Sequence, residues 1–126
     1  ADLMKFIDIP CEISFVKVAS YTGTESSGKI TEVIGLNEDI TGREVVIVED
    51  IVDTGKTMER MLKVLWKKSP ANIHISTLLL KPGKLQVALN IKYAAMEIPN
   101  DFIVGYGLDY DQQGRNLRDI YTLVQE

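Results

Sequence analysis

The sequence has one cysteine, a deficit of basic charge and no long apolar run, and each shortage excludes a class of protein. Cys11 has no second cysteine with which to form an internal disulfide, which suits a reducing compartment. No apolar stretch is long enough to cross a bilayer, and no signal peptide is visible. The net charge is −4, with 14 Lys and Arg against 18 Asp and Glu, whereas nucleic-acid binding usually leaves a basic footprint. We therefore expect a cytoplasmic protein that binds neither membrane nor nucleic acid.

The rest of the composition is that of one globular domain. The 126 residues are 45% hydrophobic and 25% charged, which is enough to bury a core. Val45 to Val48 is a continuous apolar run that predicts a strand buried on both faces of a parallel sheet. A helix is expected over roughly 55–68, where Met58, Met61, Leu62 and Leu65 recur at helical spacing. Ile73 to Leu80 predicts a second buried strand, so the unit is βαβ and the fold α/β.

Shorter elements are expected on either side of this unit. Ile13 to Val18 and Ile30 to Ile34 predict two strands, joined as a long hairpin by the glycine-containing loop 21–28. Further short strands are predicted at 93–96, 102–104 and 121–124.

The first residues, Ala1 to Ile7, place Leu3, Met4 and Ile7 on one helical face with no capping residue before them. Because the chain also opens without methionine, this pattern predicts that it begins inside a helix of a longer protein.

The most informative stretch runs from Val45 to Met58 and is V-V-I-V-E-D-I-V-D-T-G-K-T-M. We expect the strand to end at Glu49-Asp50, with Asp53 in a short turn and Thr-Gly-Lys-Thr opening the helix. Ligands of open parallel sheets lie beyond the carboxyl ends of the strands, and helix N-termini bind phosphate. The turn therefore suits a phosphate and the carboxylates suit sugar hydroxyls or a metal, so a phosphorylated sugar would satisfy both.

Spacing alone leaves a structural interpretation open, since acidic turns and Asp or Thr helix caps are common. A Walker A loop is excluded, because Asp50 stands where that pattern needs a glycine.

This stretch closely resembles the phosphoribosyl-pyrophosphate signature of the type I phosphoribosyltransferase family, in the form of its hypoxanthine-guanine branch. Other motifs resemble the family in the right order: Ser20-Tyr21 its flexible loop, Leu78 to Lys81 its purine-contacting strand, Ile98 to Tyr110 its purine-binding segment. Arg115 stands at the place of its late arginine. The resemblance covers essentially the whole chain.

The resemblance implies a type I phosphoribosyltransferase fold, with helices flanking a mainly parallel sheet in a single domain over residues 1–126. The family's early pyrophosphate-binding loop has no counterpart here, which implies that the domain is N-terminally incomplete.

The activity implied by the resemblance is transfer of ribose 5-phosphate from phosphoribosyl pyrophosphate to hypoxanthine or guanine. The products would be IMP or GMP and pyrophosphate, the reaction would serve purine salvage, and the cofactor would be Mg²⁺. The family's members are usually dimers or tetramers, so we expect a homo-oligomer.

The family's roles then pass to matching positions of this sequence. Asp53 would be the acid/base group beside purine N7. Glu49 and Asp50 would contact the ribose hydroxyls directly or through magnesium, with Asp109 at a second magnesium or its waters. Thr54, Gly55, Lys56 and Thr57 would hold the 5-phosphate.

Lys81 would donate to purine O6, Phe102 would stack on the base and Ile103 would meet its edge through the main chain. Arg115 would bind pyrophosphate, and Ser20 and Tyr21 would close over the reaction.

Three other functions compete with this interpretation. A regulatory protein could keep the fold and only sense the sugar phosphate, although it would not need Asp53, Lys81, Phe102 and Asp109 together. A transferase of the same fold could act on orotate, adenine or uracil, although Lys81 favours a 6-oxopurine. A phosphoacceptor receiver domain would not need the Thr-Gly-Lys-Thr turn. His74, the single histidine, is predicted to be structural.

Overall fold

The computed structural model describes residues 1–22 and 29–124, with the side chains of 20–22 and 29–31 outside the description. The chain divides into two compact units, Ala1–Asp39 and Ile40–Glu126. The single domain over residues 1–126 stays a prediction.

The first unit contains a hairpin, as the sequence predicted. Strand β1 (Lys17–Thr22) pairs antiparallel with β2 (Lys29–Ile34), from Lys17 opposite Ile34 to Thr22 opposite Lys29. The connecting residues 23–28 lie outside the described residues. The strand expected at 13–18 begins only at Lys17, because the described residues provide no pairing strand for 13–16. Ile13 and Phe15, the apolar residues that suggested it, are exposed.

The opening residues form a single short turn rather than a long amphipathic helix. The 3-10 helix η1 covers Leu3–Phe6, and none of its residues is buried. All three residues that were expected to share one helical face, Leu3, Met4 and Ile7, are exposed.

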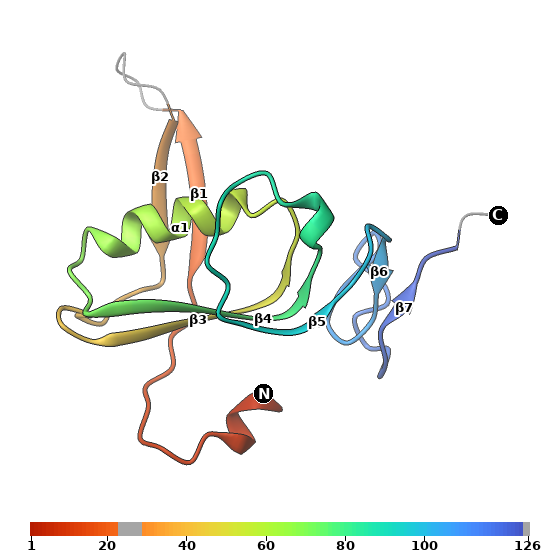
Figure 1. Cartoon of the computed structure of the whole chain (residues 1–126), viewed down its shortest axis with the longest axis horizontal. Helices are drawn as coiled ribbons and strands as arrows, with labels where there is room; N and C mark the ends of the chain where they lie inside the picture. The colour runs from red at the N-terminus through yellow and green to blue at the C-terminus, as the bar shows by residue number, and fades with distance from the viewer. Residues whose placement is uncertain (23–28, 125–126) are drawn as a thin grey trace. The chain divides into compact units, whose positions relative to one another are not determined.

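The second unit is built on a parallel sheet, in agreement with the predicted α/β fold. Its strands are β3 (Glu44–Val52), β4 (Asn72–Leu80) and β5 (Tyr93–Glu97), and they pair in the order β3-β4-β5. Helix α1 (Lys56–Trp66) connects β3 to β4 and lies over one face of the sheet (Figure 1). In the part of the chain that the structure describes, α1 is the only α-helix, so flanking helices are found on one face alone.

The core lies between α1 and the sheet. Met58, Met61 and Leu65 of α1 are buried, and so are Ile47 of β3 and Ile75 of β4. Each buried apolar side chain of this size contributes about 1.5–3 kcal/mol relative to an exposed one. The apolar face predicted for the helix is therefore confirmed, although its bounds are narrower than 55–68.

The prediction that the Val45–Val48 run is buried on both faces is wrong for the described chain. Val46 and Val48 are 54% and 59% exposed, whereas Ile47 between them is buried. Successive side chains of a strand point to opposite faces, and α1 covers only one of them. The sheet therefore carries an exposed apolar row.

The N-terminal ends of β3 and β4 are joined by side chains. Glu44 accepts a hydrogen bond from Asn72 at 2.6 Å, and its other oxygen lies 3.2 Å from Nε2 of His74. The hydrogen bond from Asn72, with His74 nearby, lowers the pKa of Glu44. His74 thus pairs with a strand neighbour.

Beyond β5, the chain forms a small antiparallel pair, β6 (Ile103–Val104) with β7 (Tyr121–Thr122). The strands predicted at 102–104 and 121–124 are present but shorter. Between them the chain turns back on itself through bridges Gly105–Leu108 and Tyr110–Gln113.

Candidate functional site

The two adjacent carboxylates lie within β3 rather than beyond its end. The sequence predicted that the strand ends at Glu49-Asp50, but β3 continues to Val52, so that prediction is wrong. Adjacent strand residues point to opposite faces. Glu49 is half-buried and Asp50 is exposed, with Oδ1 of Asp50 accepting a hydrogen bond from the N–H of Ile51 at 2.7 Å. The two carboxylates therefore do not form one side-by-side pair.

Glu49 is the carboxylate whose environment disfavours its charge. Burial raises its pKa, and the nearby negative charge of Asp50 raises it further. A cation or hydrogen-bond donor brought by a ligand would relieve both effects.

The turn after β3 ends at Gly55, a position whose backbone conformation and close neighbours require glycine. Gly55 has φ 82°, in the left-handed region, and directly precedes α1. A Cβ at this position would lie 2.8 Å from Leu89 and 2.9 Å from Val87. Any larger residue would therefore strain the backbone and push away the segment that covers the turn.

The start of α1 keeps backbone donors available. Gly55 caps the helix without a side-chain hydrogen bond, and the Lys56 N–H makes only a long 3.4 Å bond to the Thr54 hydroxyl. Free N–H groups and the helix dipole favour an anion at such an end.

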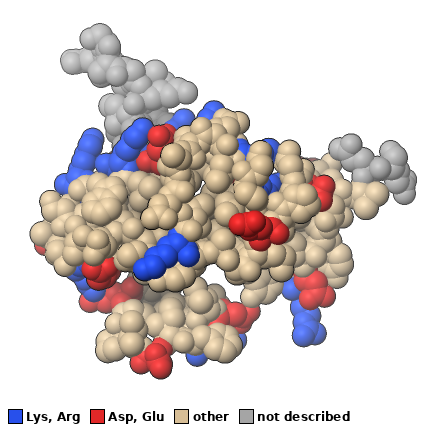
Figure 2. Space-filling model, viewed as in Figure 1, with Lys and Arg blue, Asp and Glu red and all other residues tan. Residues whose placement is uncertain are grey.

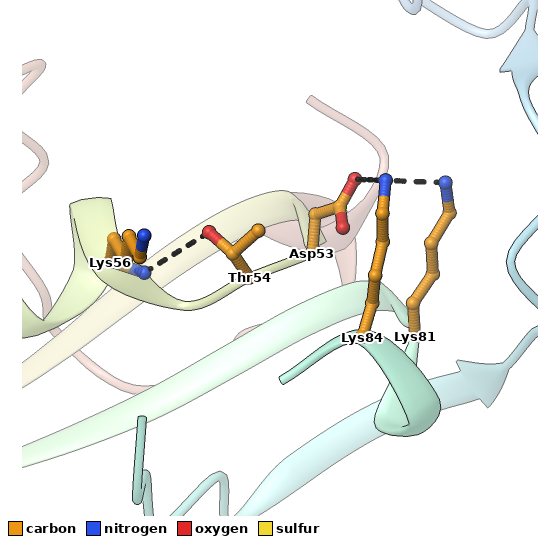
Figure 3. Close-up of polar contacts among 5 residues, drawn as sticks. All are labelled: Asp53, Thr54, Lys56, Lys81 and Lys84. Atoms are coloured by element: carbon orange, nitrogen blue, oxygen red, sulfur yellow. Dashed lines mark hydrogen bonds and ion pairs between the residues drawn. The ribbon is translucent and has the colours of Figure 1, made fainter. Parts of the chain in front are cut away.

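A partly open hollow of about 210 Å³ joins the half-buried carboxylate to this turn. Its lining residues come from β3, the turn and the start of α1: Glu49, Ile51, Val52, Thr54, Gly55, Thr57 and Met58. Four of the predicted sugar-phosphate residues thus share one cavity, whereas Asp50 and Lys56 do not line it. Lys56 lies at the helix start, on the far side of Thr54 from Asp53 (Figure 3).

Asp53 is the centre of a charged group that neighbours this turn. Its Oδ2 lies 3.3 Å from Nζ of Lys84 and 3.7 Å from Nζ of Lys81, and Figure 3 shows both lysines reaching the same oxygen. Its Oδ1 is buried and accepts no hydrogen bond from the described residues. An unsatisfied buried acceptor costs about 1–3 kcal/mol, so this atom is a candidate contact for a ligand donor.

Lys81 is buried, with only 5% of the residue exposed. Lysine is almost never this buried unless it is paired, and Asp53 supplies the opposite charge. The structure therefore brings together the predicted acid/base residue and the predicted purine-contacting lysine.

Backbone hydrogen bonds tie the lysines to the turn that carries Asp53. The Lys81 N–H donates to the Val52 carbonyl at 3.1 Å, and the Gln86 N–H donates to the Thr54 carbonyl at 2.9 Å. Between these points the 3-10 helix η2 (Pro82–Lys84) turns the chain.

Sequence reasoning missed Lys84. Its signal was the Lys-Pro-Gly-Lys spacing, in which a tight turn returns the second lysine toward the first.

The predicted purine-binding segment begins where β4 ends, since the Ile98 N–H donates to the Leu80 carbonyl at 2.8 Å. Phe102 is 52% exposed and meets Tyr110 edge to face, with ring centroids 5.6 Å apart. Ile103 lies in β6. Phe102 is thus not a core residue, and its stacking role stays a prediction.

Asp109 and Arg115 are engaged with each other. Nη2 of Arg115 lies 2.8 Å from Oδ1 of Asp109, and Nη1 donates to the Gly107 carbonyl at 2.9 Å. Oδ2 of Asp109 accepts from the Gln112 N–H at 2.9 Å. Their roles toward magnesium and pyrophosphate stay predictions.

Two sets of predicted residues are not assembled into one site. Among the described residues, no group of three or more His, Cys, Asp or Glu is placed to hold a metal ion. Ser20 and Tyr21 lie in β1, in the other unit, and their side chains are outside the description.

Surface charge is spread thinly on the face drawn in Figure 2. Lys and Arg are interspersed there with Asp and Glu over a largely uncharged surface. Binding of a charged ligand therefore depends on local charged groups, such as the one around Asp53.

No helix in the described ranges has the length and apolarity required to cross a membrane.

The chain is similar to known proteins over most of its length. The family model "Phosphoribosyl transferase domain" matches residues 2–111. A Mycobacterium bovis hypoxanthine-guanine phosphoribosyltransferase is 43% identical over 97% of this chain, which spans 61% of that relative's length. A Haemophilus influenzae hypoxanthine phosphoribosyltransferase is 42% identical over 100% of the chain and 71% of the relative. The crystal structure of a Staphylococcus aureus hypoxanthine phosphoribosyltransferase superposes with a TM-score of 0.86 at 41% identity, covering 98% of this chain and 67% of that one.

Proposed function

Since the chain belongs to the phosphoribosyl transferase family, we propose that it transfers ribose 5-phosphate from phosphoribosyl pyrophosphate to hypoxanthine or guanine. The products are IMP or GMP and pyrophosphate, and the reaction serves purine salvage. The names of the similar proteins support this substrate class.

The observation that carries the proposal is the pair formed by Lys81 and Asp53. A buried ammonium donor lies 3.7 Å from a carboxylate whose other oxygen is buried and accepts no hydrogen bond from the described residues. A 6-oxopurine offers the complementary pair, an acceptor at O6 and an N–H at N7. A base with a 6-amino group would oppose a donor to a donor, so the pair favours hypoxanthine or guanine over adenine.

Asp53 also directly precedes the phosphate turn Thr54–Thr57 in the sequence, so the acid/base group lies beside the sugar-phosphate site. In the proposed reaction, N9 bonds to the anomeric carbon while the bond from that carbon to pyrophosphate breaks, and its electron pair leaves with pyrophosphate. The N7 proton passes to Oδ1 of Asp53. A positioned acid/base group of this kind contributes about 10²–10⁴-fold in rate.

The phosphate turn holds the other end of the substrate. Gly55, Thr54 and Thr57 line the same hollow, where the backbone at the helix start and the two hydroxyls would bind the 5-phosphate. Lys56 adds charge at the helix start. Binding of the 5-phosphate here orients the sugar and holds its anomeric carbon close to the base.

Magnesium fits the carboxylates of β3. Mg²⁺ binds through one or two carboxylates and completes its shell with substrate oxygens and water, so it does not need a three-carboxylate cluster. Glu49, which lines the hollow, would hold it at the sugar, and Asp109 would hold a second ion or its waters. Asp50 points to the other face of β3, so it would not share the ion held by Glu49. When bound, the ion neutralises charge on the polyphosphate.

Arg115 is proposed to bind pyrophosphate, and Phe102 and Ile103 to contact the base. Ser20 and Tyr21 are proposed to close over the reaction. We propose a cytoplasmic dimer or tetramer, which analytical ultracentrifugation of the full-length protein would test.

A steady-state assay of the full-length protein tests the function. It supplies phosphoribosyl pyrophosphate with hypoxanthine, guanine, xanthine, adenine or orotate, in magnesium or in chelator. We expect turnover of hypoxanthine or guanine and no turnover in chelator. Turnover of adenine or orotate alone would indicate another transferase of this fold. Binding of the sugar phosphate without turnover of any base would indicate a regulatory protein.

A further inference from the structure

Lys84 makes the shorter of the two cationic contacts to Asp53, although no motif of the proposed function includes it. Its Nζ lies 3.3 Å from Oδ2, within hydrogen-bond distance, whereas Nζ of Lys81 lies 3.7 Å from the same atom. Lys84 is also the more accessible lysine, with 39% of its side chain exposed against 7% for Lys81. The two lysines therefore differ in both their distance from Oδ2 and their exposure.

The backbone places Lys84 next to Asp53. The Lys84 N–H donates to the Lys81 carbonyl at 3.0 Å, closing the η2 turn. Two residues later, the Gln86 N–H bonds the Thr54 carbonyl at 2.9 Å. The ammonium is therefore brought to Asp53 by the tight η2 turn and by a backbone hydrogen bond two residues beyond it.

The need for a second cation follows from what Lys81 must do in the proposed reaction. To donate to the base, Lys81 turns its ammonium from Asp53 toward the ligand. The Asp53 side chain is 37% exposed but its Oδ1 is buried, so losing a cationic partner is unfavourable when nothing replaces it. Lys84 supplies that replacement at Oδ2, so the carboxylate stays paired while Lys81 contacts the base.

The same contact selects which oxygen faces the ligand. The carboxylate torsion of Asp is soft and roughly two-fold, so either oxygen could take either place. A charge-assisted hydrogen bond from Lys84 to Oδ2 holds one orientation, and Oδ1 remains the open acceptor.

We propose that Lys84 is a positioning residue, which holds Oδ2 of Asp53 so that Oδ1 accepts the purine proton and Lys81 is free to bind the base. This inference rests on the proposed function. It differs from a role in substrate binding, because Lys84 acts through Asp53.

The test compares variants of the full-length protein. Lys84→Met removes the charge, Lys84→Arg keeps it, and Lys63→Met removes a lysine of α1 that pairs with Glu59 at 3.4 Å. The measurements are kcat with hypoxanthine and the Kd of phosphoribosyl pyrophosphate by equilibrium titration. Thermal unfolding checks each variant, and Lys84→Gln replaces Lys84→Met where the latter does not fold.

We expect Lys84→Met to lower kcat about tenfold, the scale of one charged hydrogen bond between partly exposed groups. The Kd of phosphoribosyl pyrophosphate should be unchanged, Lys84→Arg should keep kcat within about threefold, and Lys63→Met should match the wild type.

An unchanged or higher kcat in Lys84→Met would overturn the proposal, because Lys84 would then be idle or would block Asp53. Equal losses in the Met and Arg variants would also overturn it, and so would a weaker Kd for the sugar phosphate. A wild-type protein that turns over no 6-oxopurine would refute the proposed function itself, which this comparison of variants does not.

Discussion

Asp53 and Asp109 are both loop aspartates beside cationic side chains, yet only one keeps an open oxygen. Oδ1 of Asp109 pairs with Arg115 at 2.8 Å, and its Oδ2 accepts from a backbone N–H at 2.9 Å. Asp53 concentrates two lysines on Oδ2 and leaves Oδ1 buried and open within the described chain. A satisfied carboxylate stabilises its own turn, whereas an open buried one is completed by a ligand.

The most severe test of this contrast is Asp53→Asn. The amide keeps the size of the side chain but cannot take a proton, so kcat should fall about 10²–10⁴-fold. The Kd of phosphoribosyl pyrophosphate should change little. Near-normal turnover would show that the open oxygen has no part in proton transfer.

Lys81→Met should give the next largest effect. The loss of the O6 donor should lower kcat/KM for hypoxanthine about 10–100-fold, since a hydrogen bond to a charged group is worth about 1.5–3 kcal/mol. Affinity for phosphoribosyl pyrophosphate, measured by titration, should stay near the wild-type value because the ammonium meets only the base. An equal loss for both substrates would contradict the assignment.

Asp109→Asn tests the other carboxylate of the comparison, the one whose two oxygens both have partners. The amide oxygen can still accept from the Gln112 N–H, but the charge toward Arg115 and magnesium is lost. We expect the magnesium concentration for half-maximal activity to rise about tenfold, the lower end for outer-shell ligands.

The matched control for Asp109→Asn is Asp111→Asn in the same turn. Asp111 has φ 48°, where Asn is well tolerated, so the magnesium dependence should not change. The same shift in both variants would assign the effect to the turn rather than to a metal.

The smallest expected effect concerns Glu49, a carboxylate that has no cation beside it among the described residues. Its raised pKa means that the folded state binds the proton more tightly than the unfolded state does. The stability that this proton contributes is present below the unfolded pKa and is lost as pH rises through the raised folded pKa. Without magnesium, Glu49→Gln should therefore raise Tm at neutral pH by about 1–3 °C. Calorimetry across pH would show the gain vanish in acid, and a gain that is independent of pH would contradict it.

Much of the site was predictable because its parts are close in sequence. The βαβ unit, the phosphate turn and Gly55 follow from apolar spacing and local backbone demands over a few residues. The wrong predictions concern features that depend on which other segments pair with a strand or cover a sheet face. Ile13 and Phe15 look like strand residues but have no described strand to pair with, and the Val45–Val48 run did not reveal that one sheet face is exposed.

By itself, the sequence determined the order of the motifs and the chemical types at the site, since these depend on residue identity and short-range geometry. Only the tertiary structure decided that Lys84 reaches Asp53 across 31 positions of the chain and that Oδ1 is the open oxygen. It also decided that β3 continues past Glu49 and Asp50, so that they point to opposite faces. The reason is physical: such contacts depend on how β3, β4 and the η2 turn pack together, and no local pattern encodes that packing.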